Sequence, residues 1–144
     1  MAAIYEKEYR LQFASEKPSG IVVVFSGSVQ GFEPAIGGSD ASFNNVNVTI
    51  LVGPYWRDVQ EVVPFVTLNG VLNTNSDEDD ALGWLISDLK WDTEGGTGDF
   101  IDEERIRLKF TIALRGEYTS SNRVGYYVTA RGRRLGHLGI KAPK

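Results

Sequence analysis

Hydrophobic and polar residues alternate along most of this chain, most clearly toward its C-terminal end. Over residues 105–115 every second side chain is apolar, and most of the side chains between them are basic. A period of two is typical of strands with one buried face. Residues 124–133 repeat the pattern, so we expect the two segments to pair as a long antiparallel hairpin. Its inner face would be apolar and its outer face basic.

Three earlier segments also predict strands. One alternating segment places on a single face the side chains of Tyr5, Tyr9, Leu11 and Phe13. The β-branched run 21–25 predicts a central strand buried on both faces, and residues 46–52 alternate again. Between these two segments, the Gly-, Ser- and Asn-rich residues 26–45 predict a long loop.

One segment has a different period. The apolar stripe of a helix is matched by the spacing of Leu82, Leu85, Ile86 and Leu89. Ser76 would cap the N-terminus of this helix, and the four acidic residues 77–80 would occupy its first turn, where carboxylates interact favourably with the helix dipole. We therefore expect one α-helix over about residues 77–91.

These elements predict a mainly β fold: a β-sandwich or flattened barrel of about seven antiparallel strands with one α-helix. A chain of 144 residues suits a single domain. We assign residues 1–134 to one β-rich domain and residues 135–144 to a C-terminal tail. In architecture alone, a helix placed before two long terminal strands resembles the subunits of bacteriophage tails and related tubular assemblies.

Composition narrows the class of protein. Hydrophobic residues make up 42% of the chain and charged residues 24%, as in ordinary globular proteins. The absence of Cys excludes disulfides, thiolate metal sites and Cys nucleophiles. Charges within the first ten residues argue against a signal peptide, and the apolar run 21–25 is too short to cross a bilayer. We expect cytoplasmic synthesis without membrane insertion, and incorporation into a virion or similar particle.

Charge is distributed in blocks. Residues 1–76 carry a net charge of −3, residues 77–104 carry −10, and residues 105–144 carry +9, which together give the total of −4. Opposite blocks on one chain favour head-to-tail contacts between copies, which close into rings or continue as filaments. The low pI of about 5.0 argues against nucleic acid as a partner. The expected partner is therefore a second copy, or another assembly protein.

Two sets of side chains would form this contact. The basic set on the outer face of the predicted hairpin is Arg105, Arg107, Lys109, Arg115, Tyr127, Arg131 and Arg133. The acidic set of the preceding segment is Asp92, Glu94, Asp99, Asp102 and Glu103. Acids of one copy would face the basic set of the next.

The acidic set also suggests an alternative. A Gly-rich loop with many carboxylates could supply the six to eight oxygens that calcium prefers, although the spacing is not that of an EF-hand. Tyr55 and Trp56 lie where a strand is expected to end, and an exposed aromatic platform can bind sugar. The alternative hypothesis is therefore a carbohydrate-binding module, with calcium as an optional ligand.

Catalysis has little support. His137 is the only His and lies in the predicted tail, which leaves no Ser-His-Asp triad and no three-His zinc site. The chain contains no P-loop, dinucleotide-binding glycine pattern or nucleophile elbow. We expect a non-enzymatic structural protein, without cofactor or bound metal, that forms homo-oligomers such as rings, tubes or virion components.

Overall fold

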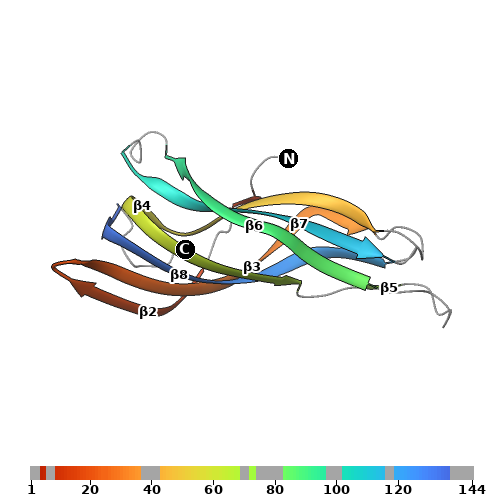
Figure 1. Cartoon of the computed structure of the whole chain (residues 1–144), viewed down its shortest axis with the longest axis horizontal. Helices are drawn as coiled ribbons and strands as arrows, with labels where there is room; N and C mark the ends of the chain where they lie inside the picture. Colours follow the sequence, from red (N-terminus) through yellow and green to blue (C-terminus); the bar gives the residue numbers. More distant parts are fainter. Residues whose placement is uncertain are drawn as a thin grey trace.

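The fold is mainly β. The computed structural model describes residues 4–5, 9–36, 43–68, 72–73, 83–96, 102–115 and 119–136. Its strands are β1 (Ile4–Tyr5), β2 (Arg10–Lys17), β3 (Gly20–Ile36), β4 (Asn44–Leu68), β5 (Leu72–Asn73), β6 (Gly83–Gly95), β7 (Glu104–Arg115) and β8 (Thr119–Leu135). Figure 1 shows the long strands running along the longest axis of the molecule.

Six of these strands form one open antiparallel sheet in the order β2-β3-β8-β4-β7-β6. The short β1 pairs with β4 in parallel, and the short β5 pairs with β8. The hydrogen bonds therefore describe an open sheet with β2 and β6 at its edges, and not the expected closed barrel or two separate sheets of a sandwich. Residues 137–144, most of the predicted tail, lie outside the described part of the chain.

The predicted helix over residues 77–91 is wrong where the structure describes it, because residues 83–91 belong to β6. A β-bulge between Ser87 and Lys90, with Asp88 at a φ of 56°, inserts an extra residue into the strand. Such an insertion puts side chains three residues apart on the same face. Ile86 and Leu89 both pack against the core for this reason, whereas Leu85 is exposed. The bulge thus places apolar side chains three residues apart on one face of a strand, a spacing that is also typical of a helix.

Two other expectations need correction. Residues 26–36 are not a loop, because β3 continues to Ile36 as it pairs with β8. The predicted hairpin between residues 105–115 and 124–133 does not form either. Both segments are strands, β7 and β8, but β4 lies between them in the sheet order. The central position of residues 21–25, between β2 and β8, is confirmed, but only one face of this segment is fully buried, because Val22 and Val24 on the other face are half-buried.

β4 organises the core because it changes partner along its length. Residues 44–56 pair with β7, and residues 56–68 pair with β8. Between these parts lies Gly53, at a φ of 75°, and a Cβ built there would overlap the ring of Phe25 on β3. The first part of β4 therefore lies over the inner face of β3. The sheet folds over on itself, and its enclosed face forms one hydrophobic core that includes Phe25, Trp56 and Leu108.

Candidate interaction surfaces

The acidic and basic sets predicted to meet between copies meet within one chain. On the outer side of β6 and β7, Asp92 is paired with Arg107 and Glu94 with Arg105, so each pair shares one face of the sheet. Arg107 donates two hydrogen bonds of 2.7 Å, from Nε and one terminal nitrogen, to the two carboxylate oxygens of Asp92. We call Asp92, Glu94, Arg105, Arg107 and Lys109 the charged face.

The electrostatics of this face are centred on Asp92. The hydrogen bonds from Arg107 are the main cause that lowers the pKa of Asp92 to about 2, and they raise the pKa of Arg107. Lys109 Nζ adds a contact of 3.1 Å to Asp92, and Glu94 lies 3.5 Å from Arg107. These charges are therefore largely neutralised within the chain, which weakens the case for Asp92 and Arg107 as partners of another copy.

Arg105 is structural in this arrangement. It is one of two buried charged side chains among the described residues, and its Nε donates a hydrogen bond of 2.9 Å to the carbonyl oxygen of Gly53. Its guanidinium carbon lies 5.7 Å from the centre of the Tyr55 ring. Arg105 thus holds the bend of β4 and, although it lies on the outer side of β7, is covered from solvent.

The other buried charge is Glu103, which lies 3.8 Å from Arg57 and close to the backbone of Gly136. Within the acidic set only Asp102 is both described and exposed, and Asp99 lies outside the described residues. Asp92 and Glu94 belong to a strand and not to a flexible loop. In the described residues no group of three or more His, Asp or Glu side chains could hold a metal ion.

The remaining residues of the basic set lie on two strands, β7 and β8, that are not neighbours in the sheet. Arg131 pairs with Glu61 at 3.0 Å and Arg133 with Asp58 at 3.3 Å, and all four side chains are largely exposed between β8 and β4. Arg115, on β7, stacks over the ring of Phe43 at 5.3 Å. The basic set is therefore not one surface, because β4 separates β7 from β8.

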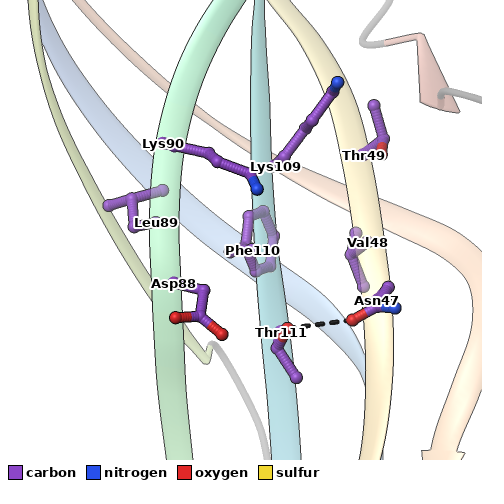
Figure 2. Close-up of a pocket in the computed structure, with 9 residues that line it drawn as sticks. All are labelled: Asn47, Val48, Thr49, Asp88, Leu89, Lys90, Lys109, Phe110 and Thr111. Atoms are coloured by element: carbon purple, nitrogen blue, oxygen red, sulfur yellow. Dashed lines mark hydrogen bonds between the residues drawn. The ribbon is translucent and has the colours of Figure 1, made fainter.

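An open groove crosses the outer side of β4, β7 and β6 beside the bulge, with a cavity volume of about 480 Å³ (Figure 2). Thr111 Oγ1 donates a hydrogen bond of 2.9 Å to Asn47 Oδ1 across it. Lys90 lies opposite Lys109 in the strand pairing, and it has no ion-pair partner among the described residues. The lining contains no His, Ser or Cys, so its reactive groups are two lysines, two threonines and the carboxylate of Asp88.

Trp56 is not the exposed platform that the sugar-binding hypothesis requires. Its side chain is fully buried, and its ring packs against the backbone of Gly132 on β8. Tyr55 is partly buried beside Arg105. The alternative of a carbohydrate-binding module therefore loses the exposed aromatic platform, one of the two observations on which it rested.

The structure shows instead an apolar surface that the sequence analysis missed. It lies on the outer side of β2, β3, β8 and β4, where neighbouring strands align their side chains in rows. One row contains Phe13, Val24, Thr129 and Val63, and the next contains Tyr127 and Phe65. We call these six residues the apolar face. Phe13 is 53% exposed, Val63 59% and Phe65 63%.

One sequence signal could have revealed part of this apolar face. Residues 62–66 are apolar without interruption, which indicates hydrophobic side chains on both sides of a strand. Phe13 was expected on the face of Tyr9 and Leu11, but a bulge between Leu11 and Phe13 turns Phe13 to the opposite side. No simple pattern predicts that bulge.

In the described residues no helix is long and apolar enough to span a bilayer. Comparisons of this chain with protein families, with curated proteins and with solved structures give no match.

Proposed function

We propose that this chain is a non-enzymatic structural protein that assembles with copies of itself, as a subunit of a ring, tube or virion-type particle. The observation that carries the proposal is the apolar face. Three of its side chains are more than half exposed although they lie on regular strands beside a well-packed core. Contiguous exposed apolar surface of this kind marks contact sites in proteins.

The edges of the sheet support the same function. β6 pairs only with β7, so one side of this 13-residue strand has no backbone partner among the described residues. Trp84 and Leu85 on β6 are exposed as well, at 53% and 52%. Long edge strands with apolar side chains favour pairing with another chain. An assembly with two kinds of contact, a sheet face and a strand edge, is able to extend beyond a dimer.

This proposal changes the expected mechanism of assembly. Charge-complementary contacts would use side chains that are already paired within the chain, such as Asp92 with Arg107. Exposed ion pairs contribute only about 0–1 kcal/mol each, whereas apolar surface contributes about 25 cal/mol per Å² removed from water. We therefore assign most of the association free energy to apolar contacts and a smaller part to charge. The sheet folds over at Gly53 so that its two halves enclose the core. We therefore keep the two-layer sandwich expected from the sequence as part of the proposal.

Light scattering coupled to size-exclusion chromatography, at low and high salt, tests the proposal. Apolar association predicts a mass above that of one chain at both ionic strengths, because salt screens charges but not apolar contacts. An oligomer that exists only at low salt would restore the charge mechanism. A single-chain mass under both conditions, at every concentration tested, contradicts assembly of the isolated chain.

A further inference from the structure

We infer that β6 forms an antiparallel pair with β6 of a second copy, about a two-fold axis perpendicular to the sheet. In this pair Ser87 of each copy lies opposite Asp88 of the other, and the sheet continues from one copy into the next. The inference rests on the proposed function and specifies the partner and register of its strand-edge contact. It starts from the free edge of β6, which has no backbone partner among the described residues.

The bulge divides β6 into two halves that mirror each other. Before the bulge, Trp84 and Ile86 lie opposite buried residues of β7 and therefore face the core side of the sheet. After the bulge, Leu89 packs against the core and Trp91 lies opposite the buried Leu108. The side chains on the outer side are those of Leu85, Ser87, Asp88 and Lys90. The sequence Trp-Leu-Ile-Ser-Asp-Leu-Lys-Trp thus has the same order of faces when followed from either end.

One antiparallel register fits this pattern along the whole segment. Residues directly opposite each other in an antiparallel pair lie on the same face of the sheet. With Ser87 opposite Asp88, Trp84 of one copy meets Trp91 of the other, and every pair over residues 84–91 joins side chains of the same face. A shift by one or two residues in either direction sets a core-side side chain opposite an outer one.

The bulge also selects a second copy over an unrelated strand. A bulge usually protects an edge, because a regular strand beside it loses the match of faces where the extra residue is inserted. A strand with the same bulge at the same place keeps the faces matched on both sides. β6 of another copy meets this condition by symmetry, and a two-fold contact requires such self-complementarity.

The chemistry of the pairs agrees with this register. Trp84 and Trp91 are 53% and 36% exposed although they face the core side, so β6 lies at the margin of the covered surface. Opposite each other, they would form an aromatic pair on each side of the axis. On the outer side Leu85 would lie opposite Lys90, whose aliphatic stem can cover it.

The charged groups nearest to the axis are Asp88 and Lys90 of each copy. Figure 2 shows the Lys90 side chain extending from β6 over β7, and the Asp88 carboxylate on the side of β6 that faces β7. Both line the groove that also contains Lys109. The two Asp88 carboxylates are therefore directed away from the free edge and from each other, and each shares a groove with lysines of its own chain.

The other free edge, β2, is the main competing partner. Its own bulge also leaves two successive side chains on the outer side, so β2 of another copy would match the faces of β6. However, that register sets Arg10 opposite Lys90, and like charges directly opposite each other are destabilising. It also sets the carboxylate of Glu16 opposite Trp84. Self-pairing of β6 has neither conflict.

A contact along one strand edge is small. Interfaces below about 1,200 Å² belong to weak or transient complexes. We therefore expect the β6 pair at high protein concentration, or where the apolar face already holds copies together and raises the effective concentration of the edge. Contacts at the edge and at the apolar face can then alternate along an open assembly.

Disulfide trapping tests the register, since the natural chain contains no Cys. Leu85→Cys and Lys90→Cys place thiols at exposed positions that would face each other only between copies. Mild oxidation of an equimolar mixture, with one variant tagged, should give at least about tenfold more covalent heterodimer than either variant gives homodimer. In a homodimer the two thiols would lie about 16 Å apart along the strands, beyond the reach of a disulfide. Circular dichroism before oxidation confirms that the variants are folded.

The outcomes separate the inference from the proposed function. A heterodimer of Lys90→Cys with Arg10→Cys would make β2 the neighbour and overturn the inference, as would efficient homodimer formation by Leu85→Cys or Lys90→Cys alone. If the wild type associates but the Leu85→Cys and Lys90→Cys mixture does not crosslink, another surface joins the copies; the inference fails and the proposed function stands. If the wild type stays monomeric and no mixture crosslinks, both fail.

Hydrogen exchange of the wild type provides a second readout that needs no thiol. Backbone amides of residues 84–91 should exchange at least several-fold more slowly at high than at low protein concentration, because the new ladder protects those on the free edge. Unchanged exchange in this segment while the average mass rises would contradict the β6 contact.

Discussion

At the scale of single residues, Asp92 shows how a charge that looks available in the sequence is used inside the fold. Its segment carries a large net negative charge, but strand register places Asp92 directly beside Arg107. Alternation predicted which residues share a face. It could not place Asp92 opposite Arg107, because the segment before β7 was expected to be a helix followed by a loop and so had no strand register.

The lowered pKa of Asp92 makes one prediction about acid stability. A carboxyl whose pKa falls from 3.8 to about 2 on folding stabilises the native state above pH 3.8 and loses this effect as the pH falls toward 2. Asp92→Asn should lower the free energy of unfolding at pH 7 by about 1 kcal/mol or less, since the pair is partly exposed. The difference from wild type should shrink between pH 4 and 2.

Urea denaturation at pH 7, 5, 4 and 3 measures this difference. Asp102→Asn is the matched control, because Asp102 is exposed and forms no ion pair with a described residue. A difference between Asp92→Asn and wild type that stays constant down to pH 3 would show that the Arg107 pair does not contribute through the carboxylate charge.

Gly53 is the second residue with a specific prediction. Its φ of 75° is unfavourable for any side chain, and a Cβ would overlap the ring of Phe25. Gly53→Ala should therefore destabilise the fold by about 2–4 kcal/mol. Gly95→Ala is the control, since a Cβ there meets nothing within 4 Å, and it should change stability by less than about 0.5 kcal/mol. Equal effects in thermal unfolding would refute the role of Gly53 in the fold-over.

At the scale of elements, β6 explains the largest error of the sequence analysis. Apolar side chains three residues apart indicated a helix, but a bulge produced the same spacing in a strand. The acidic residues 77–80 strengthened the wrong interpretation, because they suit the first turn of a helix. The clean alternation of residues 105–115 gave the right element, β7, but the wrong neighbour. Local pattern thus predicted most strands, and neither the bulges nor the strand order.

The bulge itself can be tested at Asp88, where a non-glycine residue adopts a φ of 56°. Asp is tolerated in this region better than β-branched residues. Asp88→Val should destabilise the protein by about 1–2 kcal/mol, whereas Asp88→Gly should be nearly neutral. Lys90→Val, at an exposed position beyond the bulge, serves as the control in chemical denaturation. If both Val variants behave alike, Asp88 carries no backbone strain.

At the scale of the whole molecule, the acidic and basic blocks of the sequence do not form two separate charged surfaces. The consecutive strands β6 and β7 are neighbours in the sheet, so acids of β6 pair with basic residues of β7, and Arg131 and Arg133 of β8 pair with acids of β4. Among the described residues, most of the exposed large hydrophobic side chains lie on the four-stranded outer face or on the edge strand β6. The candidate site could not be found from charge blocks, because it depends on which apolar side chains the strand order leaves outside.

The most direct test of assembly through the apolar face is sedimentation equilibrium of the wild type, Phe65→Glu and Phe43→Glu. Phe43 is the matched control, since it is also an exposed aromatic side chain but lies outside both the apolar face and β6. The average mass of the wild type should rise above the 15.9 kDa of one chain as concentration increases. Phe65→Glu should remain near the single-chain mass, with an association Kd raised at least about tenfold, and Phe43→Glu should associate as the wild type does. A wild type that stays at one chain throughout, or equal losses in both variants, would contradict the account.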